Sequence, residues 1–175
     1  MNRQDIREID NILKYIHERN VSGVDKVYVL ASSSILNDAI LRNECSALTE
    51  KSPICNNFVT TAHVDKRDGI PLRFFKSKYI ITSTPVQFHL NKKDQQVIEI
   101  LRDKIVKREG FGRNYKKLEA EFILDGNTKV LIYQRLNEKF DENDLREISD
   151  IFAKMYPDHK RKFLFSQEAV DNITE

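Results

Sequence analysis

The chain has 175 residues, of which 40% are hydrophobic and 32% are charged, a balance typical of a globular domain. Its 29 Lys and Arg residues nearly balance 27 Asp and Glu residues, so the formal net charge is only +2. A protein that binds nucleic acid usually carries a clustered basic excess. We therefore predict a single domain over residues 1–175 and no nucleic acid partner.

No apolar run in the sequence approaches the length that a membrane-spanning helix needs. The first twenty residues carry charges throughout, unlike a secretory signal peptide. The sequence alone therefore predicts a soluble chain.

The only cysteines are Cys45 and Cys55, which flank a polar loop that contains a proline. Their spacing matches no metal-binding motif, and we expect neither a metal nor another cofactor. So few cysteines favour free thiols. A disulfide bond between the two is the alternative, and the sequence leaves both open.

The amino-terminal part shows helix, strand and helix patterns in turn. Residues 1–20 form a predicted N-terminal helix, because isoleucine and leucine repeat at helical spacing. The run KVYVLA at 26–31 predicts a strand that is covered on both faces. Three serines at 32–34 follow, and a serine here is a suitable cap for a helix over 35–41.

The middle of the chain repeats this alternation. Residues 58–64 predict a strand that ends in the charged turn DKRDG, and YIITS at 79–83 predicts another strand. Asn91 predicts the cap of a long helix in which Ile98 and Leu101 face the core. We expect the YIITS strand to be parallel to KVYVLA in the same sheet.

The pattern then changes to a hairpin. Residues 118–124 and 129–134 predict two strands joined by Asp-Gly-Asn, a strong hairpin signal. Asp141 predicts the cap of a last helix, and residues 157–175 form a tail that we expect to be partly ordered. The whole order predicts an α/β fold, a three-layer sandwich with a mainly parallel central sheet and an antiparallel hairpin at one edge.

Polar side chains follow two of the predicted strands. Because parallel strands end on the same side of a sheet, where such folds bind ligands, we predict that these side chains converge there. Carboxylate, guanidinium, amide and imidazole groups all bond to sugar hydroxyls, and the cationic and N–H groups also bond to a phosphate. The candidate ligand-binding residues are Asp65, Arg67, Asp68, Gln87, His89 and Gln96.

Each of these residues also has a purely structural interpretation. Arg67 can bridge Asp65 and Asp68 in an internal turn network, because structural ion pairs cluster charges too. Gln87 and His89 can instead cap loops and bond to the backbone.

The sequence contains no complete catalytic motif. A two-histidine phosphoesterase needs a hydroxyl two residues after each histidine, but Asp65 follows His63 and Asn91 follows His89. The serines at 32–34 lack the glycines of a nucleophile elbow and of a dinucleotide-binding turn. We therefore predict recognition of a ligand without catalytic residues.

Several segments together resemble a known family. They are VYVLASSSILNDAILRN, VDKRDGIP, YIITSTPVQFHLNKKDQQVI, EGFGRNY and YP, which occur in this order between Val27 and Pro157. This set is similar to the carboxy-terminal soluble region of bacterial polytopic membrane glycosyltransferases. Those enzymes resemble dolichyl-phosphate-mannose protein mannosyltransferases and take sugars from polyprenyl-phosphate donors.

The resemblance implies a non-catalytic accessory domain on the extracytoplasmic side of a membrane glycosyltransferase, aiding donor or acceptor recognition. Its partners would be the membrane-embedded portion of the parent protein and a sugar or polyprenyl-phosphate head group. The family's catalytic acids lie in the membrane part, so the resemblance assigns none to this chain.

Two other classes of function fit the same sequence. One is a free-standing nucleotide- or small-ligand-binding α/β domain, or a small enzyme, with its site at the same sheet edge. The other is a protein-interaction module that uses the face of the hairpin.

Overall fold

The computed structural model describes residues 3–20, 23–47, 53–61 and 64–174. Within these ranges the strands form one sheet in the order β1-β2-β4-β3. β1 and β2 are parallel, whereas β4 is antiparallel to both β2 and β3, so the fold is mixed α/β. The strands are β1 (Val27–Val29), β2 (Tyr79–Thr84), β3 (Tyr115–Leu124) and β4 (Thr128–Arg135).

The predicted parallel pair is confirmed, because Val29 of β1 lies opposite Ile81 of β2. The prediction of a mainly parallel sheet is wrong. The second hairpin strand, β4, pairs along the whole of β2 on the side away from β1, and it adds two antiparallel ladders to the one parallel ladder. The hairpin does lie at an edge, with β3 outermost.

The strand predicted over residues 58–64 is also wrong for the described part of that range. Phe58 makes one parallel bridge with Val27, and the chain then leaves the sheet. Val64 has a positive φ of 55°, which an extended strand does not allow. His63 lies outside the described residues.

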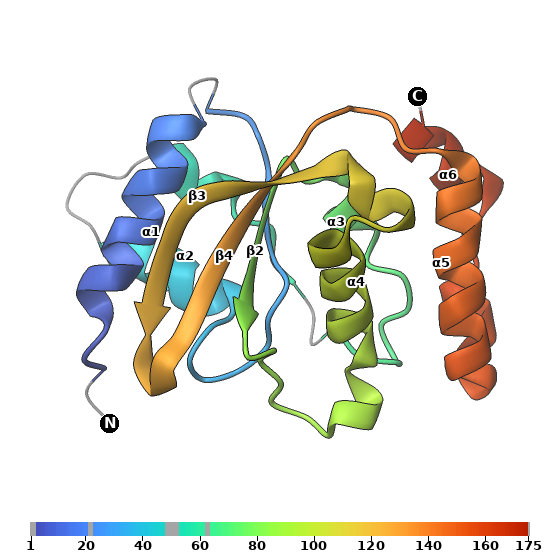
Figure 1. The fold of residues 1–175 in the computed structure, drawn as a ribbon, viewed down its shortest axis with the longest axis horizontal. Helices are drawn as coiled ribbons and strands as arrows, with labels where there is room; N and C mark the ends of the chain where they lie inside the picture. Colours follow the sequence, from blue (N-terminus) through green and yellow to red (C-terminus); the bar gives the residue numbers. More distant parts are fainter. Residues whose placement is uncertain (1–2, 21–22, 48–52, 62–63, 175) are drawn as a thin grey trace.

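Helices lie on both sides of the sheet (Figure 1). One side carries α1 (Ile6–Arg19) and α2 (Asp38–Ala47), and the other side carries the remaining helices. These are α3 (Leu72–Lys76), α4 (Gln96–Lys107), α5 (Glu142–Met155) and α6 (Gln167–Thr174). The tail after α5 is ordered as the 3₁₀ helix η5 (Pro157–Phe163) and α6.

Alternate residues of the strands fill two separate hydrophobic cores, because neighbouring side chains of a strand point to opposite faces. Val29 and Ile81 face the α1–α2 side, where they join Leu13 and Leu41. The intervening Ile80 faces the other side and joins a cluster built on α4 and α5. This second cluster is rich in aromatic rings, and those of Tyr28, Phe74, Phe75, Phe111 and Tyr115 meet mostly edge to face.

The two cysteines are joined, so the expectation of free thiols is wrong. The Cα atoms of Cys45 and Cys55 lie 5.6 Å apart, and the bond connects α2 to the 3₁₀ helix η1 (Pro53–Asn57). Cys45 is fully buried on the inner face of α2, which brings its sulfur to the segment that runs back to β1. Spacing along the sequence could not reveal this packing.

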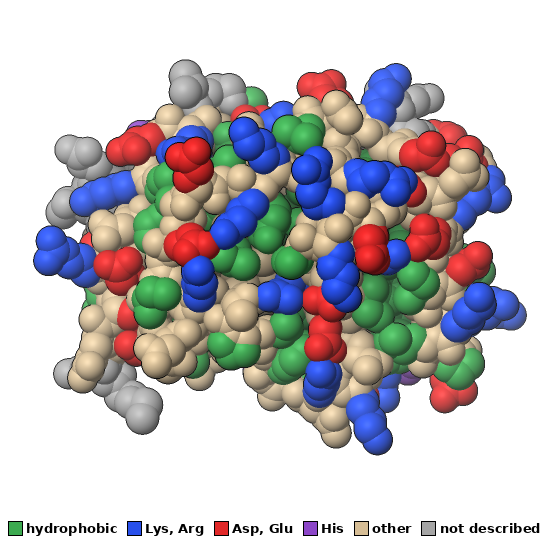
Figure 2. Space-filling view, in the orientation of Figure 1, with side chains coloured by type: hydrophobic (Ala, Val, Ile, Leu, Met, Phe, Trp, Pro, Cys, Tyr) green, Lys and Arg blue, Asp and Glu red, His purple; other side chains and the backbone are tan. Residues whose placement is uncertain are grey.

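The surface matches the balanced composition. Figure 2 shows basic and acidic side chains interspersed over the face that it draws, without a large region of one sign. Among the described residues, no helix combines the length and the apolar character that crossing a bilayer requires.

The core position of Leu101 gives a test of the fold. Leu101 is fully buried in α4, so Leu101→Ala should lower the free energy of unfolding by about 2–5 kcal/mol, measured by urea denaturation. Val106→Ala is the control on the same helix, because Val106 is 41% exposed. A Leu101→Ala loss below about 0.5 kcal/mol, as for a surface change, would contradict the packing described here.

Candidate functional site

A pocket of about 430 Å³ opens where β1 and β2 end, and we call it the β1–β2 pocket. Residues 31–34 lead out of β1, and His89 lies in the loop after β2. The first turns of α2 and Thr61 complete the lining. The pocket therefore lies at the carboxyl end of the parallel pair, as the sequence predicted for a binding site.

A serine and a histidine meet in this pocket. The Ser32 Oγ lies 2.6 Å from the His89 Nδ1, although 57 residues separate them in the sequence. Gln95 holds the same ring, because its Oε1 accepts hydrogen bonds from the backbone N–H groups of His89 and Leu90, and its Nε2 lies 3.4 Å from the Nδ1. Ser32 is buried and His89 is exposed at the rim.

Gln87 lies beneath this pair and joins the two loops. Its Oε1 accepts a hydrogen bond of 2.9 Å from the Ser33 Oγ, and its Nε2 donates to the backbone oxygen of Pro85 at 3.2 Å. The backbone oxygen of Gln87 also accepts from the N–H of Ser32 at 3.0 Å. Gln87 is only 9% exposed, so its amide is largely occupied in holding the loops together.

The wall of the pocket on α2 is charged and hydroxylated. The Asp38 carboxylate is buried and accepts a hydrogen bond of 2.7 Å from Thr61, and Arg42 forms an ion pair of 3.1 Å with its other oxygen. Asn37 caps α2, because its Oδ1 accepts from the backbone N–H of Ile40. The predicted serine cap is therefore wrong for this helix, which begins later than the sequence suggested.

The charged turn after the second predicted strand is a separate network. Asp65 is 1% exposed and accepts hydrogen bonds from the backbone and guanidinium N–H groups of Arg67, with a shortest distance of 2.6 Å. Asp68 accepts from the backbone N–H of Asp65. The hydrogen bonds from Arg67 to Asp65 raise the pKa of the guanidinium further above its ordinary value. This arrangement resembles the internal turn network that the sequence left as an alternative, except that Arg67 bonds to Asp65 while Asp68 accepts from the backbone.

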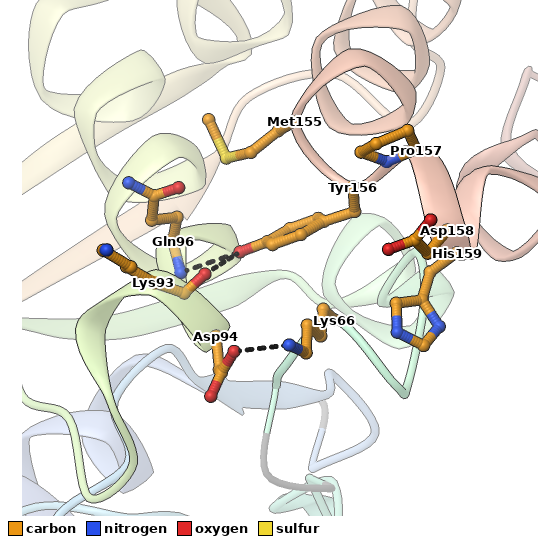
Figure 3. Close-up of a pocket in the computed structure, with 9 residues that line it drawn as sticks. All are labelled: Lys66, Lys93, Asp94, Gln96, Met155, Tyr156, Pro157, Asp158 and His159. Carbon is orange, nitrogen blue, oxygen red and sulfur yellow. Dashed lines mark hydrogen bonds and ion pairs between the residues drawn. The ribbon is translucent and has the colours of Figure 1, made fainter.

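Gln96 lies in a third place, a pocket of about 500 Å³ between the start of α4 and the end of α5 (Figure 3). There the Tyr156 ring spans from α5 towards Gln96, and its hydroxyl accepts from the Gln96 N–H at 3.1 Å and donates to the Lys93 backbone oxygen at 3.2 Å. Burial raises the pKa of Tyr156. Below the ring, Lys66 and Asp94 form an ion pair of 2.7 Å.

The predicted convergence is thus seen only in part. Gln87 and His89 share one hydrogen-bonded cluster, whereas Asp65, Arg67 and Asp68 form another. The two segments do meet, but through the side chains of Lys66 and Asp94, which the sequence analysis did not select.

Ser32, Ser33, Asp38, Arg42 and Thr61 are among the residues lining this pocket that were not selected from the sequence. A usable signal was present for Ser32, because it follows a strand that was correctly predicted to neighbour the one before His89. Thr61 carried no such signal, since the strand predicted around it does not form.

Within the described ranges, no cluster of three or more His, Cys, Asp and Glu residues is arranged to bind a metal ion. Comparison of the chain with protein-family models, curated proteins and solved structures finds no match.

A stability measurement can test whether Asp65 has a structural role in the turn. Asp65→Ala should lower the free energy of unfolding by about 1–3 kcal/mol, because the turn loses the hydrogen bonds that the buried Asp65 carboxylate accepts from the backbone and side chain of Arg67. Urea denaturation measures this loss, and Glu138→Ala, a change at an exposed carboxylate, serves as the control. Unchanged stability of the Asp65 variant would count against a structural role.

Proposed function

We propose that this chain is a ligand-recognition domain whose β1–β2 pocket binds a small hydroxylated ligand such as a sugar. The observation that carries the proposal is the lining of that pocket. Hydroxyl, imidazole, carboxylate and guanidinium groups from three segments gather at the carboxyl end of a parallel strand pair. Such a mixture offers both donors and acceptors, as sugar hydroxyls require.

The arrangement is rigid enough to recognise a ligand. Asp38 and Arg42 are fixed by their ion pair and by Thr61, and His89 is fixed by Gln95. Groups held in place before binding lose little conformational entropy when the ligand arrives.

The family resemblance supports a further proposal about the larger protein in which this recognition would occur. We propose an accessory role in a membrane glycosyltransferase, with the pocket aiding recognition of the donor or the acceptor and the membrane-embedded portion of the parent as partner. Of the residues first selected, His89 lines this pocket and Gln87 bonds to Ser33 of its lining, whereas Asp65 and Arg67 hold a separate turn.

A titration of the isolated chain with D-mannose and with mannose 1-phosphate, followed by amide chemical shifts in NMR, tests the binding proposal. We expect the largest shift changes over residues 31–42 and at Thr61 and His89. Arg42→Gln should weaken binding by about tenfold, the effect of losing roughly one charge-assisted hydrogen bond.

Arg146→Gln is the matched control for Arg42→Gln. Both arginines form ion pairs with the acid one helical turn earlier, but Arg146 lies on the exposed face of α5. Chemical-shift changes confined to the pocket between the start of α4 and the end of α5 would contradict recognition at the β1–β2 pocket. Equal weakening of ligand binding by both variants would contradict it as well.

A further inference from the structure

We propose that Ser32 is a nucleophile with His89 as its base, and that the β1–β2 pocket hydrolyses a small O-acyl ester carried on its hydroxylated ligand. The hydroxylated part of this substrate rests on the proposed function. The ester chemistry rests on the serine and histidine alone.

The distance between the two side chains is the first argument. A Ser32 Oγ to His89 Nδ1 separation of 2.6 Å is within the reach that a nucleophile and its base require. The contact is built into the sheet, because the Leu30 N–H donates to the Ile81 oxygen at 2.7 Å and the Ser32 N–H donates to the Gln87 oxygen at 3.0 Å. The first bond extends the strand pairing by one residue, and the second joins the two loops that follow the strands.

The contacts of Gln95, which is fully buried, indicate which of Ser32 and His89 donates the proton in their hydrogen bond. Two backbone N–H groups bond to its Oε1, so its Nε2 is the amide atom that faces the histidine. An amide nitrogen only donates, so its 3.4 Å contact with the Nδ1 of His89 favours the tautomer that carries the ring proton on Nε2. In this tautomer the Nδ1 has one lone pair, and the Ser32 hydroxyl, the nearer group at 2.6 Å, donates to it, which is the direction that activates a serine.

The neighbouring Ser33 is excluded as the nucleophile by its own hydrogen bonds. Its Oγ donates to Gln87 and accepts from the backbone N–H groups of Ile35 and Leu36, so all of its hydrogen-bonding capacity is used inside the turn. Ser32 is thus the serine of the pocket that has a histidine base and a cavity in front of it.

The pocket also contains a group that stabilises developing negative charge. Arg42 lines it, and the hydrogen bond and ion pair with Asp38 engage the Nε and one Nη of its guanidinium. A guanidinium has five N–H donors, so this pairing, within the described part of the chain, leaves donors for an oxyanion.

The reaction balances without a co-reactant other than water. The Ser32 oxygen bonds to the ester carbonyl carbon while its proton moves to the Nδ1 of His89. The bond between the carbonyl carbon and the ligand oxygen then breaks, and this oxygen takes the proton from His89. Water, losing a proton to His89, attacks the acyl-serine, and the carboxylic acid and the free Ser32 hydroxyl are released.

The test uses the 175-residue chain, a fluorophosphonate probe and p-nitrophenyl acetate. We expect the probe to label Ser32, located by peptide mass spectrometry, and the acetate to be hydrolysed with Ser32 acylated in between. Ser32→Ala should abolish labelling, and His89→Asn should slow it by about a hundredfold, a typical contribution of a general base. Ser166→Ala, a change at an exposed serine before α6, should label as the parent chain does.

Ser32→Cys covers the case in which Ser32→Ala fails to fold, because a cysteine beside His89 should react with iodoacetamide faster than the same cysteine in the His89→Asn background. No labelling of Ser32, or equal labelling in the His89→Asn variant, would overturn the proposal. Mannose binding measured on the same sample separates the two ideas. Mannose binding without labelling of Ser32 would contradict only the proposal that Ser32 is a nucleophile. Labelling without mannose binding would contradict only the proposal that the pocket binds a sugar.

Discussion

The parallel pairing of β1 with β2 is the constraint on which the candidate site depends. Its register aligns Val29 with Ile81, and the hydrogen bonds that continue past the strands bring Ser32 against Gln87 and His89. Each strand is buried on both faces by the two cores, so a slip by one residue would turn both sets of side chains to the wrong side. The register of this pair therefore determines which residues lead out of the strands into the pocket.

Local patterns predicted much of the fold. Strands form within KVYVLA, over Val27–Val29, and over YIITS, and the Asp-Gly hairpin forms as predicted. The helix that buries Leu101 also forms, but it begins at Gln96, and Asn91 caps the 3₁₀ helix Lys92–Asp94 before it. The sheet's mixed character was not predictable in the same way, because a hairpin pattern says that β3 and β4 pair with each other but not which free edge they join. The disulfide bond was not predictable for a similar reason, since it depends on how α2 packs.

The site was predicted less well than the fold, and the reason is physical. Charged residues such as Asp65 and Arg67 are easily selected from a sequence as ligand contacts. In the structure, however, they bond to each other within one short turn. A small hydroxyl such as that of Ser32 carries no charge, and its place after a strand is the cue that the sequence offers. Its significance comes from a histidine 57 residues away, which only the sheet topology brings within bonding distance.

The bond between Cys45 and Cys55 has a practical consequence for work with this protein. It fastens the far end of α2, the helix whose first turns supply Asp38 and Arg42 to the pocket wall. Reducing cytosol keeps thiols apart, whereas secretory compartments oxidise them. In material purified from a reducing host, non-covalent contacts alone therefore hold this helix in place, and two preparations of identical sequence can differ in how firmly it is held. The thiol content of each preparation is the quantity to determine before their binding data are compared.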